Sequence, residues 1–371
     1  MKKNQVAIID IGSSEIRAVI AERGINKTFV LKEEYSLAYD GFENLKFYSE
    51  ESVKEILTNL CQKLVKAIGG GARTVFVGVP SAFTEVFVKE GRIAFTKRKK
   101  ICEEDVDSLF DAAFMQNFST KKLINRSAVV YELGDARRVA NPIGLSSEIL
   151  KGTLSFIVCD NYFIEIVSSS LIKSGFKNVE FASVSLAESL YLIEANVRDR
   201  VSLLVDVGYI TSTLSVVQGD GIIFEKSFEF GGGYITANLL EKFNLDFEVA
   251  EKLKRKVNLC SLSKNGVYDM TDVAGGSYYD AEEVKRSILQ SLDAFCEQIA
   301  LVIENMGFYL PEYVPLSITG GGIVYIRGAK EHISKRLNMA VEVLSPKVPL
   351  MDKPTNSSIL SLLDLVLEQN S

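Results

Sequence analysis

The 371-residue chain has no tryptophan and a single histidine, His332. With one histidine, neither a multi-histidine metal site nor a histidine-based catalytic triad is expected. The five cysteines stand far apart in the chain, and no Cys-x-x-Cys pair occurs. An odd number of unpaired cysteines and the lack of a signal peptide predict buried, reduced thiols in a cytoplasmic protein.

Long apolar runs and an excess of positive charge are also missing. Every stretch of about 18 residues contains a charge, so no transmembrane helix is predicted. Any membrane contact is therefore expected to be peripheral, at the inner face of the cell membrane, or indirect. The net charge of −6 argues against nucleic-acid binding. The one dense basic run, residues 97–100, precedes acidic residues, and we interpret it as a solvated loop before a helix.

What the chain does contain is an ordinary globular composition, 47% hydrophobic and 24% charged. Its length predicts two or more domains. Two stretches share one plan: an apolar strand, an Asp-x-Gly turn and a second strand. The first turn contains Asp10 and Gly12, and the second contains Asp206 and Gly208 at the same interval of 196 residues. This regularity predicts an internal duplication of a β-turn-β unit.

Glycine-rich turns follow each of two further strands, at residues 231–233 and 320–322. Glycine lets backbone N–H groups come close to phosphate oxygens, and Mg²⁺ prefers one or two carboxylates acting through water. The order of the four turns therefore favours a site for ATP and Mg²⁺, with Asp10 and Asp206 as the catalytic residues that hold the metal through water. The predicted cofactor-binding residues are Gly12, Ser13, Ser14, Gly208, Thr211, Gly232, Gly233, Gly320, Gly321 and Gly322.

Each of these signals also has a simpler interpretation. An isolated Asp-x-Gly is more often only a β-turn, and a Gly-Gly-Gly can be a flexible loop. Glu251 and Lys254, three residues apart, could form one surface ion pair. The combination and order of the turns, rather than any one of them, carry the prediction.

The whole pattern resembles the actin-like ATPase superfamily and, within it, the FtsA family of bacterial cell-division proteins. The resemblance rests on IIDIGSSEIRAVIAE, VDVGYIT, FGGGYITANLLEKF and ITGGGIVYIRGA in this order. It implies an α/β fold with two ribonuclease-H-like halves around a nucleotide cleft, and it adds Glu251 and Lys254 as residues near the ribose and base. The stretches VFVGVPSAFTEVFVKEGRIAF and GTLSFIVCDNYFIEIV resemble the start and end of the small domain, an SHS2 domain, that FtsA inserts in its first half.

The resemblance also predicts the domain organisation. The first core half comprises residues 1–79, 161–198 and 347–371, and the inserted small domain comprises residues 80–160. The second core half comprises residues 199–240 and 300–346. Residues 241–299 form a small domain within the second half, of which the polar stretch 245–277 is expected to be irregular.

Three departures from the family pattern weaken the predicted site. Tyr209 and Ile210 stand where the family has glycines, and Asn238 stands where it has an aspartate. Since a β-branched residue disfavours positive φ, Ile210 cannot adopt a glycine conformation there. We therefore expect weak ATP binding and weak or no ATPase activity. The third departure is that the chain ends soon after its last core helix, without the amphipathic membrane helix of the family.

The implied function is a divergent FtsA-like scaffold that forms or joins actin-like filaments or dimers. Its partners would be itself and other division proteins. Residues 282–292 lack the charge pattern expected of the helix that docks the tail of the tubulin-like protein FtsZ, so weak or absent binding of that tail is expected, with a different partner on this surface. The alternatives are a type IV pilus assembly protein of the PilM kind, or an active ATPase or kinase of the same superfamily.

Overall fold

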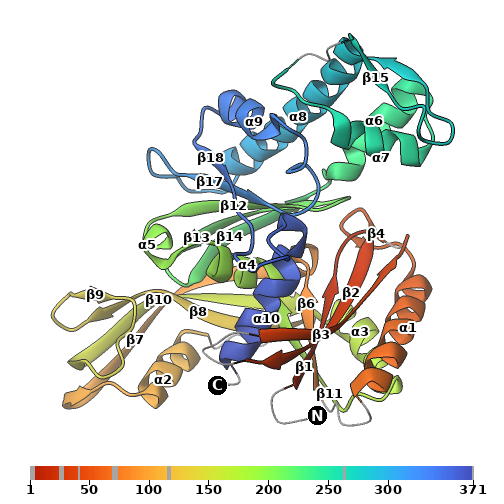
Figure 1. Ribbon diagram of the computed structural model, residues 1–371. Helices are drawn as coiled ribbons and strands as arrows, with labels where there is room; N and C mark the ends of the chain where they lie inside the picture. Colours follow the sequence, from red (N-terminus) through yellow and green to blue (C-terminus); the bar gives the residue numbers. More distant parts are fainter. Residues whose placement is uncertain are drawn as a thin grey trace.

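The computed structural model describes residues 5–24, 29–40, 42–68, 74–114, 118–261 and 265–369. Two five-stranded sheets form the body of the molecule (Figure 1). The first sheet has the order β11-β6-β1-β2-β3 and the second has the order β14-β13-β12-β17-β18. The strands of the first sheet are β1 (Gln5–Ile11), β2 (Glu15–Arg23), β3 (Phe29–Ala38), β6 (Thr74–Val79) and β11 (Asn178–Ser183). Those of the second are β12 (Ser202–Val207), β13 (Ser212–Gln218), β14 (Gly221–Phe228), β17 (Leu316–Thr319) and β18 (Val341–Val343).

The two sheets have the same topology. In each, three antiparallel strands in chain order are followed by two strands that add in parallel beside the first. Asp10 pairs in register with Arg17 on β2, and Asp206 pairs with Thr213 on β13. The internal duplication predicted from the sequence is thus present in the sheets, and both aspartates lie at the same strand end.

Both faces of the first sheet are covered because its strands are apolar on both sides. On β1, Ala7 and Ile9 belong to the core that contains α1 (Glu50–Ile68) and α3 (Asn161–Lys173). Val6 and Ile8 belong to the opposite core, which contains α4 (Val184–Leu192) and α10 (Ser357–Gln369). The first half therefore takes its last covering helix from the far end of the chain. The remaining small elements are β4 (Phe42–Glu43), β5 (Lys46–Phe47), α5 (Ala195–Arg198) and η2 (Pro354–Asn356).

The second sheet carries four helices and a small hairpin: α6 (Gly232–Phe243), α7 (Phe247–Lys256), α8 (Ala281–Glu304), α9 (Ala329–Leu337), β15 (Val267–Asp269) and β16 (Tyr278–Asp280). The expectation that residues 245–277 are irregular is wrong, because α7 lies within them. Val249, Ala250 and Leu253 are fully buried and recur at helical spacing between charged residues. The high charge of this stretch concealed its amphipathic period.

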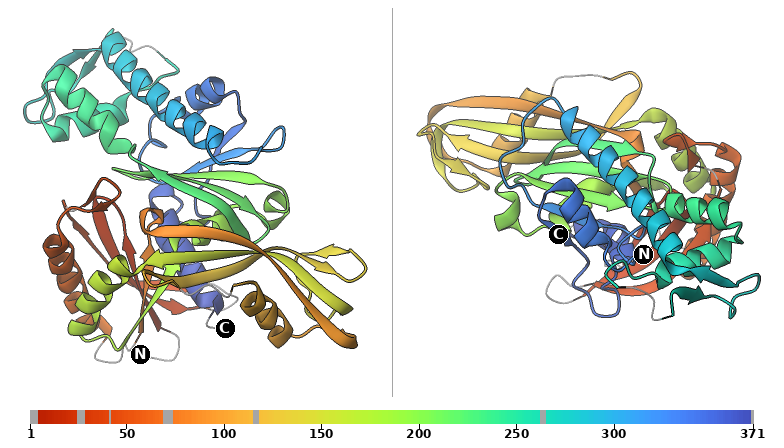
Figure 2. Two further views of the ribbon diagram at one scale, coloured as in Figure 1. Left: turned by 180° about the vertical axis from the view of Figure 1, so that it is seen from behind. Right: turned by 90° about the horizontal axis from the view of Figure 1, so that it is seen from above.

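The unit inserted after β6 is a four-stranded antiparallel sheet with one helix, and it lies against the second sheet, away from α1 (Figures 1 and 2). Its elements are η1 (Ser81–Phe83), β7 (Thr84–Lys100), α2 (Glu103–Ala113), β8 (Lys121–Leu133), β9 (Arg138–Val139) and β10 (Ser146–Asp160). Residues 97–100 were expected to be a loop. They are instead the end of β7, because Lys99 and Lys100 pair with Ser147 and Ser146 of β10.

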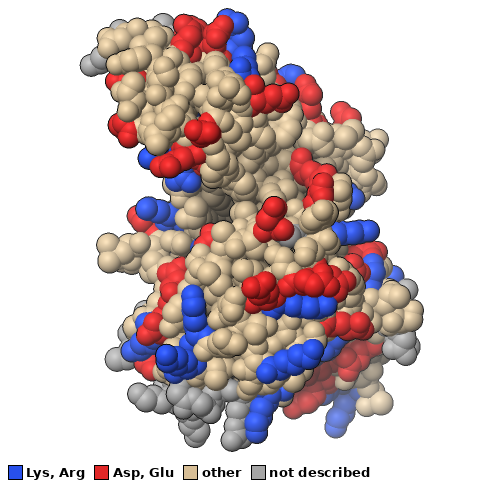
Figure 3. Space-filling model, turned by 90° about the vertical axis from the view of Figure 1, so that its right-hand side faces the viewer, with Lys and Arg blue, Asp and Glu red and all other residues tan. Residues whose placement is uncertain are grey.

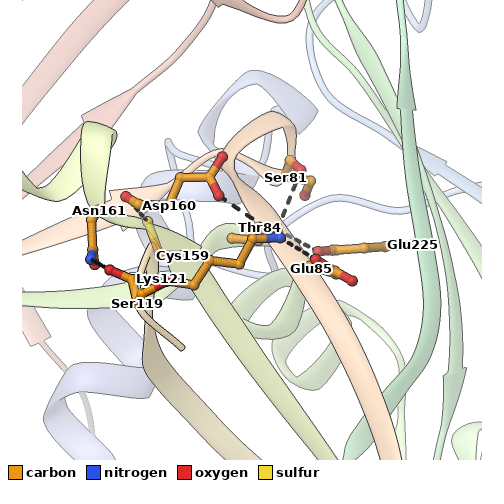
Figure 4. Close-up of polar contacts among 9 residues, drawn as sticks. All are labelled: Ser81, Thr84, Glu85, Ser119, Lys121, Cys159, Asp160, Asn161 and Glu225. Atoms are coloured by element: carbon orange, nitrogen blue, oxygen red, sulfur yellow. Dashed lines mark hydrogen bonds and ion pairs between the residues drawn. The ribbon is translucent and has the colours of Figure 1, made fainter. Parts of the chain in front are cut away.

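Polar contacts fasten the base of this unit (Figure 4). Lys121 at the start of β8 forms ion pairs with Glu85 on β7 and with Asp160 at the end of β10. Thr84 donates a hydrogen bond to Glu225 of β14, which belongs to the second half. The inserted unit is therefore tied both to the segment from which it departs and to the opposite half.

The turn between β13 and β14 extends this connection. Asp220 donates its N–H to the carbonyl of Ala128 at 3.0 Å, and Ser155 donates to the carbonyl of Ile222 at 2.6 Å. Gly219 has a φ of +58°, and a Cβ at this position would lie 2.0 Å from the carbonyl oxygen of Val129. Only glycine can occupy this point of contact without displacing the backbone.

The cysteines are all free, as predicted. Three of them are buried, but Cys102 is half-buried and Cys260 is exposed, so the expectation of burial is wrong for these two. Among the described residues, no helix is both long and apolar enough to cross a membrane.

Candidate functional site

A cavity of about 320 Å³ lies where the ends of β1 and β12 face each other. Its size falls at the lower end of the range for small-molecule sites, about 300–1,000 Å³. Figure 3 shows the surface hollowed between the part that carries α6 to α8 and the part below, with acidic and basic side chains interspersed on this face. The predicted site residues that line the cavity are Asp10, Gly12, Ser13, Ser14, Asp206, Gly208, Thr211, Gly320 and Gly321.

The carboxylate of Asp10 is already paired. Its Oδ2 accepts a hydrogen bond from Arg17 at 3.0 Å and another from Ser358 at 2.6 Å. Arg17 also donates to Ser358 at 2.9 Å and to Asn356 at 3.4 Å. The first Asp-x-Gly turn is thereby connected to the start of α10 through one partly buried network.

The backbone of the second turn also makes contacts within the protein. Ile210 donates its N–H to the hydroxyl of Ser13 at 3.1 Å, which joins the two turns directly. Gly208 donates its N–H to the carbonyl of Thr211 at 2.9 Å, as Gly12 does to Glu15 in the first turn. Tyr209 and Ile210 are not among the described residues with positive φ. The turn thus follows a path that these side chains permit, as expected from the sequence.

The glycines at 231–233 and 320–322 allow three backbone segments to meet. Gly232 and Gly233 donate their N–H groups to the carbonyls of Gly208 and Tyr209 at 3.0 and 2.7 Å. Gly322 donates to Val207 at 2.8 Å, and a Cβ on Gly232 would lie 2.5 Å from the carbonyl oxygen of Gly322. The N–H groups of Gly232 and Gly233 at the start of α6, and that of Gly322 after β17, thus bond to neighbouring carbonyls. None of these three glycines lines the cavity.

Glu251 and Lys254 are not a surface pair. The Nζ of Lys254, whose side chain is 5% exposed, lies 2.6 Å from Glu251 Oε1, 2.8 Å from Thr236 Oγ1 and 2.9 Å from the carbonyl of Gly232. Burial lowers the pKa of Lys254, and the Glu251 carboxylate opposes this shift. The ammonium also lies 5.7 Å from the centre of the Tyr209 ring. The pair holds α6 and α7 together behind the cavity, which neither residue lines.

Three carboxyl groups gather at the inner end of the cavity. Asp206 and Glu188 both line it, and Glu188 is 1% exposed. Burial raises the pKa of Asp206 to about 6, and the charge of Asp10 adds to the shift while Arg17 opposes it. Burial also raises the pKa of Glu188 well above its usual range, with contributions from Asp206 and Asp10. Arg17 and Arg255 also line the cavity, but only Arg17 opposes the shifts of these two acids, so the inner end favours protons or added positive charge.

Three residues of the site were not predicted: Arg17, Glu188 and Ser358. Arg17 could have been found, because an Asp-x-Gly turn joining two antiparallel strands places it opposite Asp10. Glu188 and Ser358 come from α4 and α10, far away in sequence, and no local pattern marks either of them.

The comparisons with known proteins agree on one family. The sequence profile described as "Cell division protein FtsA" matches residues 203–362. "Cell division protein FtsA" of Staphylococcus epidermidis is 21% identical over 374 residues, covering 97% of this chain and 78% of the relative. That of Helicobacter pylori strain J99 is 22% identical, covering 89% of this chain and 74% of the relative. Over most of its length this chain is therefore similar to FtsA, at low identity.

Solved structures show that the FtsA relative has the expected actin-like fold. The "PilM-PilN type IV pilus biogenesis complex" matches with a TM-score of 0.62 and 16% identity over 98% of both chains. MreB 5 of Spiroplasma citri bound to AMPPNP matches with a TM-score of 0.57 and 11% identity, over 100% of this chain and 98% of that one. The α/β fold with duplicated halves, predicted from the sequence, is confirmed.

Proposed function

We propose that this FtsA relative is a bacterial cell-division scaffold that forms or joins actin-like filaments or dimers and binds ATP only weakly. The similarity to FtsA along most of the chain supports the division role. The weak site is supported chiefly by the hydrogen bond from Ile210 N–H to Ser13. This bond uses a backbone donor of the second turn that a phosphate group would otherwise receive.

The other residues of the cavity point the same way. The Asp10 carboxylate that would hold Mg²⁺ through water is bonded to Arg17 and Ser358, and the N–H groups of Gly232 and Gly233 are bonded to carbonyls. Losing two charge-assisted N–H contacts, at about 1.5–3 kcal/mol each, weakens a ligand roughly 10²- to 10⁴-fold. These residues therefore fit a tightly bound Mg-ATP poorly, and we propose weak or no ATPase activity.

The test of the weak site is calorimetry with Mg-ATP on the parent and on a Tyr209→Gly/Ile210→Gly variant. We expect weak binding by the parent and at least tenfold tighter binding by the variant, because the bulky side chains leave the turn. Circular dichroism would verify that the variant is folded. Brisk ATP hydrolysis by the parent, unchanged by the two glycines, would contradict the proposal.

Residual nucleotide binding should depend on the cavity. Asp10→Ala removes the carboxylate of the first turn, and a side chain at Gly321 would meet Thr355, since a Cβ there lies 2.6 Å from Thr355 Cγ2. Asp10→Ala and Gly321→Val should each weaken ATP binding in the glycine-restored variant. If both bind nucleotide like their parent, the cavity is not the nucleotide site.

The scaffold role and the PilM-like alternative can be distinguished by the partners that the protein binds. Pelleting of the purified protein in sedimentation assays is expected for a filament-forming scaffold. The exposed face of α8 carries Glu282, Glu283, Lys285 and Arg286 without the expected charge pattern, so a peptide of the FtsZ tail should bind weakly or not at all. Failure to pellet, together with tight binding of a pilus protein's N-terminal peptide, would favour the PilM-like role.

A further inference from the structure

Glu188 is a buried carboxyl group that faces the cavity without a partner. It lines the cavity from α4, is 1% exposed, and its Oε1 has no hydrogen-bond partner among the described residues. Burying such an oxygen unsatisfied costs free energy. The proposed weak ATP site leaves this group without a role.

The surroundings of Glu188 supply further oxygen atoms. Beyond the glycine turns, the cavity is lined by hydroxyl side chains from β13 and β14, namely Thr213, Ser215 and Ser227. Asp206 lies at the same end, opposite Thr213 in the β12–β13 register. Within the described part of the chain, Arg17 pairs with Asp10, and no lysine or arginine forms an ion pair with Glu188 or Asp206. The inner end of the cavity therefore combines neutral oxygens with two acidic groups that form no ion pair among the described residues.

We propose that this inner end binds a small monovalent cation, an alkali metal ion or ammonium, between Glu188 and the hydroxyl oxygens. Hard cations prefer oxygen ligands, and a divalent ion is usually held by several carboxylates. The described residues contain no group of three or more His, Cys, Asp or Glu side chains that could hold a metal ion. In the proposed ligand set Glu188 is the one carboxylate, and with the neutral hydroxyl oxygens it would balance a single positive charge. The direction of the Glu188 pKa is consistent with this, because an acid without a counter-ion resists ionisation.

The test is thermal unfolding of the nucleotide-free, full-length protein in K⁺, Na⁺, NH₄⁺ or choline chloride at equal ionic strength. A ligand that binds only the folded state raises the Tm in a saturable way. We expect at least one small cation to raise the Tm by several degrees over choline, and the ion with the lowest half-saturation concentration is the preferred ligand. Equal Tm values in all four salts would overturn the proposal.

Two variants assign the effect to Glu188. Glu188→Gln keeps the shape and removes the charge, so the cation-dependent rise should disappear. Glu225→Gln is the matched control, because Glu225 also has a buried oxygen without a partner but does not line the cavity. Its Tm should keep the cation response. A response that survives in Glu188→Gln would overturn the site.

Should Glu188→Gln fail to fold, crystals of the parent soaked in Tl⁺ give an independent answer. An anomalous peak beside Glu188 supports the site, and its absence there overturns it. Neither measurement uses nucleotide, so the outcome is separate from that of the ATP experiments.

Discussion

Glu225 on β14 is a buried carboxyl group at the contact between the second half and the inserted unit. Its Oε1 accepts a hydrogen bond from Thr84, while its buried Oε2 has no partner in the described structure. Burial raises the pKa of Glu225, and the hydroxyls of Thr84, Ser185 and Ser81 oppose the shift. Such a group stabilises the folded state less once it must ionise.

Glu225→Gln should therefore change the pH dependence of stability. A carboxyl whose pKa is raised by folding contributes stability that is fully present below its unfolded pKa, about 4.5, and is lost as pH rises through the folded pKa. The variant should match the parent near pH 4 and become more stable than the parent toward pH 8. The difference in unfolding free energy should be about 1.4 kcal/mol for each tenfold decrease that folding causes in the acid dissociation constant of Glu225. Urea unfolding across pH measures this, with Glu34→Gln on β3 as an exposed control. A constant difference at every pH would contradict it.

At the scale of elements, the main effect of the glycine turns is that they let backbone segments come into close contact. Gly232, Gly208 and Gly322 bring the start of α6, the end of β12 and the turn after β17 into contact. The same residues were interpreted from the sequence as a phosphate cradle. Sequence shows that such turns need glycine, but it cannot show whether the close neighbour is a ligand or another segment of the chain.

Gly232→Ala should be destabilising because its Cβ would lie 2.5 Å from the carbonyl oxygen of Gly322. Overpacking of this kind costs about 1–3 kcal/mol. Gly134→Ala is a suitable control, since the nearest atom to a Cβ there is the hydroxyl oxygen of Ser147 at 3.3 Å. Urea unfolding should show the loss for Gly232→Ala alone. Equal stability of the two variants would mean that the junction can adjust.

Prediction of helices and strands succeeded where the local sequence pattern determines the structure. It failed where pairing with a distant strand determines it. The two strand-turn-strand units lie where the repeat placed them, as β1 with β2 and β12 with β13. Residues 97–100 carry the charges of a loop, yet they pair with β10, whose position depends on the rest of the inserted sheet. Within the cavity, Asp10 and Asp206 were predictable from the repeat, whereas Glu188 depends on how α4 packs.

At the scale of the whole molecule, the inserted unit is held from two directions. Lys121 fastens its base, and the turn between β13 and β14 contacts its strands through Gly219 and Asp220. A change in the angle between the two halves would either break these contacts or move the inserted unit together with the second half. The unit therefore connects the halves at a second place, apart from the cavity.

Gly219→Ala should weaken this connection. Its φ of +58° costs an alanine about 1–2 kcal/mol, and the clash with the carbonyl of Val129 should add about 1–3 kcal/mol. Gly144→Ala is the matched control, with a φ of +82° and nothing within 4 Å. Thermal unfolding and hydrogen exchange in β8 should both show a larger effect for Gly219→Ala. Similar results for the two variants would show that the contact contributes little.

The placement of α10 on the first sheet has a consequence for synthesis on the ribosome. The second sheet is built from the contiguous residues 202–343, but the core that contains Val6 and Ile8 is completed by α10, residues 357–369. Although domains generally fold from the N-terminus during translation, the first half has one apolar face that is covered only in part, by α4, until α10 has emerged. Its opening strands are thus the part most in need of a chaperone.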